Sequence, residues 1–297
     1  MARAWLLLLG ALLAPSVTPP TLAGVVPPLA PRPPWALRPG HATEAGGCAC
    51  TDRRLCLPIS APPPAHESFV FLEADGPGDL GPEGDFLKWD WTAITTVAVC
   101  HAEALPPGAM AALTCRAHAA GARVVFAKFV DKGNDLPLLL PAALGNASAR
   151  AVWVSAHVAM VQAAGADGIN LDLEVPVASG SAMASHITEF ASELTAALRT
   201  AQPGAQVTLC TPSLAAGDCT YGRCYEYARL AAVLDFLVVM DYSGNGVGRA
   251  EGVSPWMSTA ALPSLQTGAA FYRALGVEPS SLVMVMPWFG FDYACTS

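Results

Sequence analysis

The residue types that could carry chemistry stand together near the middle of the chain, in the stretch Asp167-Gly168-Ile169-Asn170-Leu171-Asp172-Leu173-Glu174. Apolar and polar side chains alternate strictly from Ile169 to Glu174. Because alternate residues of a strand face opposite sides, Asn170, Asp172 and Glu174 would share one face. Carboxylates are rarely buried unless they are paired or functional. The stretch therefore predicts a functional site rather than an ordinary buried strand, which would be apolar throughout.

Two carboxylates at this spacing on one strand face lie about 6–7 Å apart. In a partly buried site each negative charge raises the pKa of the other, so one carboxyl keeps its proton and can act as a general acid. Such a pair could protonate a leaving oxygen, as glycosidases do. The same carboxylates could instead bind Mg²⁺ or Ca²⁺ if Asp241 or Asp292 lay beside them. A buried polar network without catalytic function is a third interpretation.

Strand-like and helix-like patterns alternate along the chain around this stretch. The clearest helix is predicted over 181–200, where Ile187, Phe190, Leu194 and Leu198 form an apolar stripe at helical spacing. Helices are also predicted over 148–164 and 261–275. The predicted strands are 68–72, 94–100, 123–130, 168–174, 206–211, 236–242 and 282–289.

This alternation is typical of a parallel sheet covered by helices, either a doubly wound sheet or a (β/α)8 barrel. The first predicted strand is not followed by Gly-x-Gly-x-x-Gly, which removes the main support for dinucleotide binding. In a barrel, active-site residues lie at the C-terminal strand ends, where Glu174 and Tyr242 fall. Seven strands leave an incomplete barrel with two open edges, so either the strand count is one short near the N-terminus or the chain is truncated. We therefore expect an α/β fold, a (β/α)8 TIM barrel truncated at its C-terminus, with the last strand missing.

The composition bounds the kind of protein. The chain has 297 residues, of which 53% are hydrophobic and 13% charged, so it can form one large or two small domains. The formal net charge is -8, with no basic cluster, so we expect no nucleic-acid partner.

The N-terminal region has the pattern of a secretory leader. Arg3 precedes an apolar run, 5–13, that is too short to span a bilayer, and Thr21-Leu22-Ala23 offers small residues for cleavage. We expect a signal peptide over 1–23, a Pro/Ala/Gly-rich linker over 24–47 and the barrel domain over 48–297, with no membrane span.

Nine cysteines and the glycosylation sequon Asn146-Ala147-Ser148 fit the secretory pathway, with the lysosome, a vacuole or the cell exterior as destination. No Cys-x-x-Cys occurs and the histidines do not cluster near the cysteines, which argues against zinc. Because nine is odd, at least one cysteine lacks an intramolecular partner. Two groupings favour disulfides, a cluster at the domain edge and a pair that could close a short loop: Cys48, Cys50 and Cys56, and Cys219 and Cys224.

The octapeptide resembles the signature of glycoside hydrolase family 18, the chitinase family, which is Asp-Gly-x-Asp/Asn-x-Asp-x-Glu on the fourth barrel strand. Residues 239–242, Val-Met-Asp-Tyr, resemble the Met-x-Tyr at the end of strand six. Residues 285–293 resemble the strand-seven segment of one subgroup, the di-N-acetylchitobiases, and so do the early cysteine cluster and residues 89–97. The resemblance covers roughly residues 48–297.

The resemblance implies a retaining glycosidase that cleaves β-1,4-linked N-acetylglucosamine in chitobiose cores or chito-oligosaccharides by substrate-assisted catalysis. Glu174 would protonate the glycosidic oxygen and later activate water, while the acetamido carbonyl of the substrate would act as nucleophile. Asp172 would orient the acetamide and stabilise positive charge on its nitrogen. The Tyr242 hydroxyl would hydrogen-bond the acetamide carbonyl.

Supporting residues also follow from the resemblance. Asn170 and Asp167 would surround Asp172, and Trp288 would offer an apolar platform to a sugar face or pack in the core. The expected partner is an oligosaccharide that contains N-acetylglucosamine. We expect no cofactor, no metal and a monomeric chain.

Some positions depart from the family pattern. Asn170 stands where many members have Asp, Ser243 follows Tyr242 where Asp is common, and 126–131 does not match the Ser-x-Gly-Gly of strand three. The tryptophan-bearing final strand, which floors the sugar pocket, is absent. Two alternatives therefore stay open: a non-catalytic, lectin-like protein that binds chitin oligosaccharides, and an inactive fragment. Glu174 counts against the first, because such lectins usually lack the catalytic acid.

Overall fold

The structure is a computed structural model that describes residues 50–61, 64, 66–73, 80, 84–102, 109–130, 141–214, 217, 219–242 and 260–287. The predicted signal peptide and linker lie outside these residues, as do Trp288 and Asp292. Across the described residues, none of the helices is long and apolar enough to cross a membrane.

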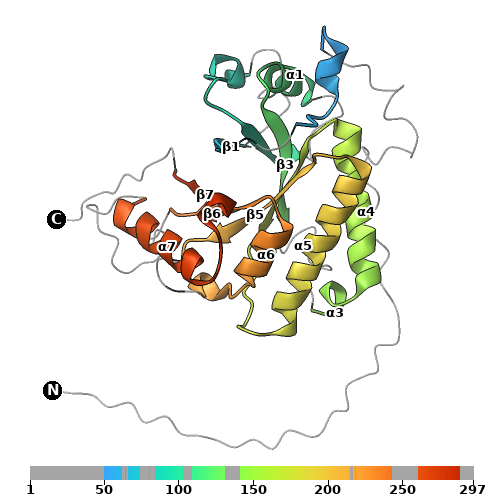
Figure 1. Ribbon diagram of the computed structural model, residues 1–297. Helices are drawn as coiled ribbons and strands as arrows, with labels where there is room; N and C mark the ends of the chain where they lie inside the picture. The colour runs from blue at the N-terminus through green and yellow to red at the C-terminus, as the bar shows by residue number, and fades with distance from the viewer. Residues whose placement is uncertain are drawn as a thin grey trace, which may run out of the picture. The chain divides into compact units, whose positions relative to one another are not determined.

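The described strands form one parallel sheet in which each strand pairs with its neighbours in chain order (Figure 1). All seven predicted strands are confirmed. The last two end earlier than predicted, so Tyr242 lies just beyond its strand. The strands are β1 (Phe69–Glu73), β2 (Thr96–Cys100), β3 (Arg123–Val130), β4 (Gly168–Leu173), β5 (Gln206–Pro212), β6 (Phe236–Met240) and β7 (Leu282–Val285).

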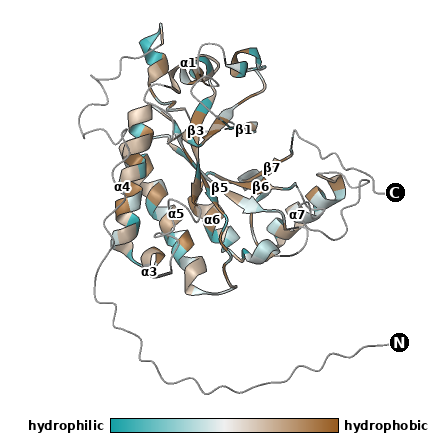
Figure 2. Cartoon of the chain, turned by 180° about the vertical axis from the view of Figure 1, so that it is seen from behind, coloured by the Kyte–Doolittle hydropathy of each residue, from teal (hydrophilic) through white to brown (hydrophobic). Residues whose placement is uncertain are grey.

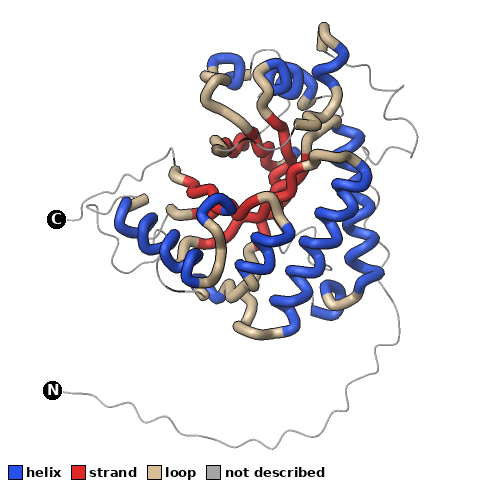
Figure 3. Tube along the Cα trace, in the orientation of Figure 1, coloured by secondary structure: helices blue, strands red, loops and turns tan. Residues whose placement is uncertain are grey.

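Helices connect the strands, and the three predicted ones are confirmed within one or two residues at each end. The α-helices are α1 (Ala111–Ala119), α3 (Pro141–Leu144), α4 (Ala147–Ala164), α5 (Ala182–Ala201), α6 (Tyr227–Val233) and α7 (Leu262–Ala274). Short 3-10 helices are η1 (Arg53–Cys56), η2 (Asp85–Lys88), η4 (Thr220–Gly222) and η5 (Pro279–Ser281). The strands lie inside and the helices around them in the tube view (Figure 3).

Local sequence explains where the two longest helices begin and which face they bury. The Asn146 side chain accepts hydrogen bonds from the backbone N–H groups of Ser148 and Ala149 and so caps α4. Gly165 ends the same helix in the left-handed conformation. The predicted stripe of α5 is buried. Both helices carry polar and apolar residues (Figure 2), as expected when one helix face packs on a sheet.

The two faces of the sheet have different surroundings. Ile169, Leu171 and Leu173 of β4 belong to the large core between the sheet and the helices. The other face of the strands forms two small apolar clusters that include Cys100 and Cys210. The predicted alternation of β4 is confirmed, because Asn170 contacts Cys210 on that second face.

The second face is the interior of a curled sheet. The ring of Phe69 in β1 meets that of Phe236 in β6 edge-on, with centroids 5.9 Å apart, although four strands separate β1 from β6 in the sheet. A doubly wound sheet would instead carry helices on both faces. The (β/α)8-barrel class is therefore confirmed. Among the described strands, β1 and β7 form the two edges.

Polar side chains close the N-terminal end of the barrel. The Thr96 hydroxyl hydrogen-bonds to Gln206 Oε1 at 3.2 Å, and Gln206 Nε2 donates to Glu67 Oε1 at 3.1 Å. Gly168 allows β4 and β5 to approach here, because a Cβ atom at this position would stand 1.9 Å from the Gln206 carbonyl oxygen.

Candidate active site

Asp172 occupies the C-terminal part of β4, on the barrel interior between Phe129 of β3 and Cys210 of β5. Its side chain is buried, and its Oδ1 atom has no hydrogen-bond partner among the described residues. Burial, and next the negative charge of Glu174, raise the pKa of Asp172 to about 7, while the nearby Arg223 cation opposes this rise. Asp172 is therefore a carboxyl group that holds its proton up to neutral pH.

Glu174 follows β4 directly and turns toward solvent, with 49% of its side chain exposed. Its Oε2 atom forms an ion pair with Arg223 Nη2 at 2.9 Å. The two acids thus differ in their surroundings: Asp172 lies inside the barrel mouth and Glu174 at its rim. Pairs of acids in contrasting environments are typical of sites that use one as a proton donor and the other for charge stabilisation.

Asn170 is the next inward residue below Asp172 and is fully buried. Its Nδ2 donates to Thr208 Oγ1 at 2.7 Å, and its Oδ1 accepts from Cys210 Sγ at 3.2 Å. Both ends of the amide are therefore held by β5. Asn170 thus supports the floor beneath Asp172.

Tyr242 lies two residues beyond β6 and is half-buried. Burial raises the pKa of its hydroxyl, and the charges of Cys210, Asp172 and Glu174 raise it further. The hydroxyl is therefore protonated and lies within electrostatic reach of both acids. The structure thus brings Asn170, Asp172, Glu174 and Tyr242 together at the C-terminal barrel end.

The structure does not bring Asp167 to this group. Asp167 precedes β4 at the opposite end of the barrel, five residues and roughly 16 Å from Asp172. Its carboxylate accepts hydrogen bonds from the backbone of Ile59 and Val124 and from His118, at 2.6, 2.6 and 2.8 Å. The expectation that Asp167 surrounds Asp172 is corrected: its contacts tie the first described segment and α1 to the sheet.

Two residues that the sequence patterns did not indicate, Tyr225 and Arg223, contact the segment around Glu174. The Tyr225 hydroxyl lies 2.8 Å from the carbonyl oxygens of Leu173 and Val175 and accepts a hydrogen bond from the Val175 N–H at 3.2 Å. It therefore braces the backbone on either side of Glu174. Arg223 is the second of these residues. It lies in the loop closed by the predicted disulfide Cys219–Cys224, which is confirmed, and that predicted loop was the one sequence feature that pointed to it.

Metal binding is not supported by the candidate ligands that the structure describes. Asp241 has the outward register of β6, and its charge acts on Tyr272 of α7, on the helix side of the sheet rather than beside Asp172. The described thiols that lie close enough to share an ion belong to Cys50, Cys56 and Cys115. All three are in disulfides, one of them Cys50–Cys115, so none offers a thiolate.

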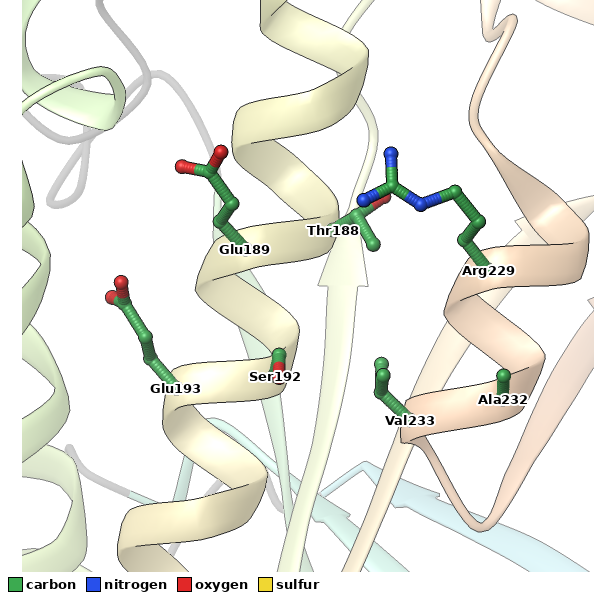
Figure 4. A pocket seen from close by; sticks show the side chains of 7 residues that line it. All are labelled: Thr188, Glu189, Ser192, Glu193, Arg229, Ala232 and Val233. Carbon is green, nitrogen blue, oxygen red and sulfur yellow. The ribbon is translucent and has the colours of Figure 1, made fainter.

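A surface hollow lies away from the barrel mouth, between α5 and α6 (Figure 4). It is lined by Thr188, Glu189, Ser192 and Glu193 from α5 and by Arg229, Ala232 and Val233 from α6. Its charged side chains are engaged in ion pairs, including Arg150 with Glu193 and Arg229 with Glu226. None of the candidate site residues lines it.

Comparisons with known proteins identify the family. A sequence model of the glycosyl hydrolases of family 18 matches residues 139–297. Di-N-acetylchitobiase of Mus musculus is 32% identical over 258 residues, covering 85% of this chain and 61% of the relative. The enzyme of Rattus norvegicus is 34% identical over 253 residues with the same shares. The chain thus spans less than two thirds of these relatives. The resemblance seen in the sequence is confirmed.

Solved structures agree on the fold. The C-terminal domain of a putative chitinase from Desulfitobacterium hafniense has a TM-score of 0.57 at 16% identity, covering 75% of this chain and 66% of that one. A class V chitinase from Cycas revoluta, solved with (GlcNAc)3, has a TM-score of 0.55 at 20% identity, covering 73% and 67%.

Proposed function

Because the chain belongs to the glycosyl hydrolases of family 18, we propose that its barrel mouth cleaves β-1,4 N-acetylglucosamine linkages in chitobiose cores or chito-oligosaccharides. The observation that carries the proposal is the pairing of a buried, protonated Asp172 in β4 with a solvent-facing Glu174 directly after that strand. The relatives named di-N-acetylchitobiase and the (GlcNAc)3 complex of the Cycas revoluta enzyme support this substrate class.

Glu174 acts as the general acid in this proposal. Its exposed carboxyl stands at the rim, where the oxygen of a glycosidic bond laid across the mouth can reach it. It donates a proton to that oxygen as the bond to the anomeric carbon breaks. After the leaving sugar departs, the Glu174 carboxylate takes a proton from the attacking water.

Asp172 binds the acetamido group of the substrate in this proposal. Its Oδ1 atom is buried without a hydrogen-bond partner among the described residues, so an acetamide N–H would supply the missing contact. As the acetamide carbonyl oxygen attacks the anomeric carbon, positive charge develops on the nitrogen. An ionised Asp172 then stabilises that charge in a site that is already shielded from water. The proton that Asp172 releases is available to Glu174.

Tyr242 positions the nucleophile. Because its hydroxyl keeps its proton, it can donate a hydrogen bond to the acetamide carbonyl oxygen and hold it beneath the anomeric carbon. Asn170, fixed from both ends by β5, keeps the floor under Asp172 rigid. Trp288 retains its proposed role as an apolar platform for a sugar face.

We also propose that the protein works in the secretory pathway, in the lysosome, a vacuole or outside the cell, as a monomer. Disulfides form and persist in oxidising compartments, and the described residues contain Cys50–Cys115 and Cys219–Cys224. The sequon residue Asn146 is exposed, as glycosylation in that pathway requires.

The test is turnover of a chromogenic chitobioside by the full chain and by Glu174→Gln. The wild type should release the chromophore, and the variant should lose at least about 100-fold in kcat while still binding chitobiose. Glu189→Gln is the matched control, because Glu189 is also a half-exposed acid paired with an arginine, but lies on α5. Equal turnover by wild type and Glu174→Gln would remove Glu174 as the acid. Binding without release by the wild type would favour the lectin-like alternative.

A further inference from the structure

Arg223 is a cation aimed at the proposed catalytic acid. Its guanidinium pairs with Glu174 at 2.9 Å, and only 12% of its side chain is exposed. It comes from the segment between β5 and α6, nearly fifty residues along the chain from Glu174. Arg223 and Glu174 are far apart in the sequence but in contact in space. Their contact therefore depends on what holds the backbone that carries the arginine.

The loop that carries Arg223 is fixed by three kinds of contact. The disulfide Cys219–Cys224 closes it. A short parallel bridge joins Arg223 to Val177 after β4, with the Val177 N–H donating to Gly222 at 2.7 Å and the Cys224 N–H donating to Val177 at 3.1 Å. The Tyr227 hydroxyl also donates to the carbonyl oxygen of Arg223. The guanidinium therefore has a defined position at the rim.

A ring lies over the same guanidinium. The Tyr221 centroid is 5.6 Å from the Arg223 guanidinium carbon, within the range of a cation–π contact. Tyr221 is half-exposed and holds a left-handed backbone, φ 57°, inside the disulfide loop. Non-glycine residues adopt this conformation rarely, and the loop closure maintains it here. Arg223 is thus held between the carboxylate of Glu174 and an aromatic face.

Arg223 supplies positive charge beside both Asp172 and Glu174. Among the described residues, the other titratable groups that interact electrostatically with both acids include Tyr225 after the loop, Cys210 of β5 and Tyr242 after β6. Burial raises the pKa of Cys210, Tyr225 and Tyr242, so these groups are neutral at working pH. Arg223 lowers the pKa of Asp172, against burial and Glu174. Its cation therefore favours the ionised form of Asp172 and forms an ion pair with Glu174.

We propose that Arg223 is a positioning residue that holds the Glu174 carboxylate at the rim of the barrel mouth through their ion pair and must release Glu174 when sugar binds. The proposal rests on the function proposed above and adds a residue to it. On release, one proton moves from Asp172 Oδ to Glu174 Oε. Asp172 is then the anion that faces the acetamide nitrogen, and Glu174 is the acid that faces the glycosidic oxygen.

Two substitutions separate the charge of Arg223 from its bulk. Arg223→Gln removes the charge, and Arg223→Lys keeps it. Arg229→Gln is the matched control, because Arg229 also pairs with a glutamate but lies on α6 outside the site. The primary readout is the titration of the Asp172 carboxyl by ¹³C NMR of the labelled full chain, assigned with Asp172→Asn. This readout does not depend on turnover.

The wild-type midpoint for Asp172 should lie near 7. In Arg223→Gln it should rise by about 1 pH unit, and the alkaline limb of the kcat/KM profile should move with it. Arg223→Lys and Arg229→Gln should leave both within a few tenths. An unchanged Asp172 midpoint in Arg223→Gln, or equal shifts in the Gln and Lys variants, would overturn the proposal.

A second variant covers the case in which Arg223→Gln does not fold. The double substitution Cys219→Ser with Cys224→Ser leaves the arginine in the chain but opens its loop. The Asp172 midpoint should again rise, by less than in the Gln variant, and an unchanged midpoint would count against the proposal. If the NMR shifts appear while the wild type shows no turnover, the positioning role stands and the proposed hydrolysis fails.

Discussion

The raised pKa of Asp172 should lower the free energy of unfolding as the pH rises. An acid whose pKa is higher in the folded than in the unfolded protein holds a proton that the unfolded chain has already lost. Folding stability therefore falls as pH rises between the two values and is flat outside them. For Asp172 these values are 3.8 and about 7. Asp172→Asn removes the ionisation and should remove this loss of stability.

The magnitude follows from the two pKa values. Each pKa unit corresponds to about 1.4 kcal/mol, so the full difference makes the ionised, buried Asp172 cost about 4 kcal/mol. Asp172→Asn should match the wild type near pH 4 and exceed its free energy of unfolding by about 4 kcal/mol at about pH 8. The same variant should lose its hydrolytic activity, as expected when a strained active site is relieved.

The assay is urea unfolding of both proteins across that pH range, followed by tryptophan fluorescence. Asp85→Asn is the control, because Asp85 is an exposed acid in a surface ion pair, and it should change stability far less than Asp172→Asn at either pH. Parallel stability curves for wild type and Asp172→Asn would refute the buried, protonated state of Asp172. A variant that is less stable than the wild type at high pH would refute it more strongly.

Three further outcomes test other parts of the structure. Gly168→Ala would place a methyl group 1.9 Å from the Gln206 carbonyl oxygen, so it should cost more than about 3 kcal/mol of stability in thermal or urea unfolding. His118 has an acceptor at each ring nitrogen and a raised pKa, because its contacts with Asp167 and Leu55 outweigh burial. His118→Gln should therefore lose stability in acid, with the difference from wild type shrinking as pH rises through the folded pKa. Ser148→Ala should remove a glycan from Asn146 in secreted protein, seen by mass spectrometry, while the Asn146 cap keeps α4 stable.

Each of these three predictions can be refuted by a specific result. Gly180→Ala, which meets no atom within 4 Å, should cost less than Gly168→Ala; equal costs would refute the close strand approach. His186→Gln, at a more exposed ion pair, is the control for His118→Gln, and coinciding stability curves for the two variants would refute the buried imidazolium. A mass that differs from wild type only by the Ser-to-Ala replacement itself would show that Asn146 carries no glycan.

Local periodicity predicted the architecture because each pattern reflects one simple contact. The alternation of β4 separates a helix-facing side from the barrel interior, and the stripe of α5 marks its buried face. Helix α1 was missed because its buried face is formed by Leu113, Thr114, Ala117 and His118, which do not make an apolar stripe. Its place depends on the Cys50–Cys115 disulfide and on the contact between His118 and Asp167, both of which join distant parts of the chain.

The site was predictable to the extent that strand alternation placed it. Asp172 and Glu174 follow from alternation, and Tyr242 from its place after a strand. Asp167 belongs to the same sequence signature, but it lies directly before β4, at the end of the strand away from Glu174. A strand of six residues is long enough to separate the two ends of the barrel. Arg223 could not be found from spacing, because its approach to Glu174 depends on a loop from the next β-α unit and on the disulfide that closes it.

The central claim is that the acetamido group of the substrate, held by Asp172 and Tyr242, is the nucleophile. The most direct test is to compare kcat/KM of the full chain for 4-nitrophenyl chitobioside and 4-nitrophenyl cellobioside, which differ in having acetamide or hydroxyl groups at carbon 2. The account predicts turnover of the chitobioside and a loss of at least about 1,000-fold for the cellobioside, because the second substrate brings no nucleophile. Comparable turnover of the two substrates would contradict it.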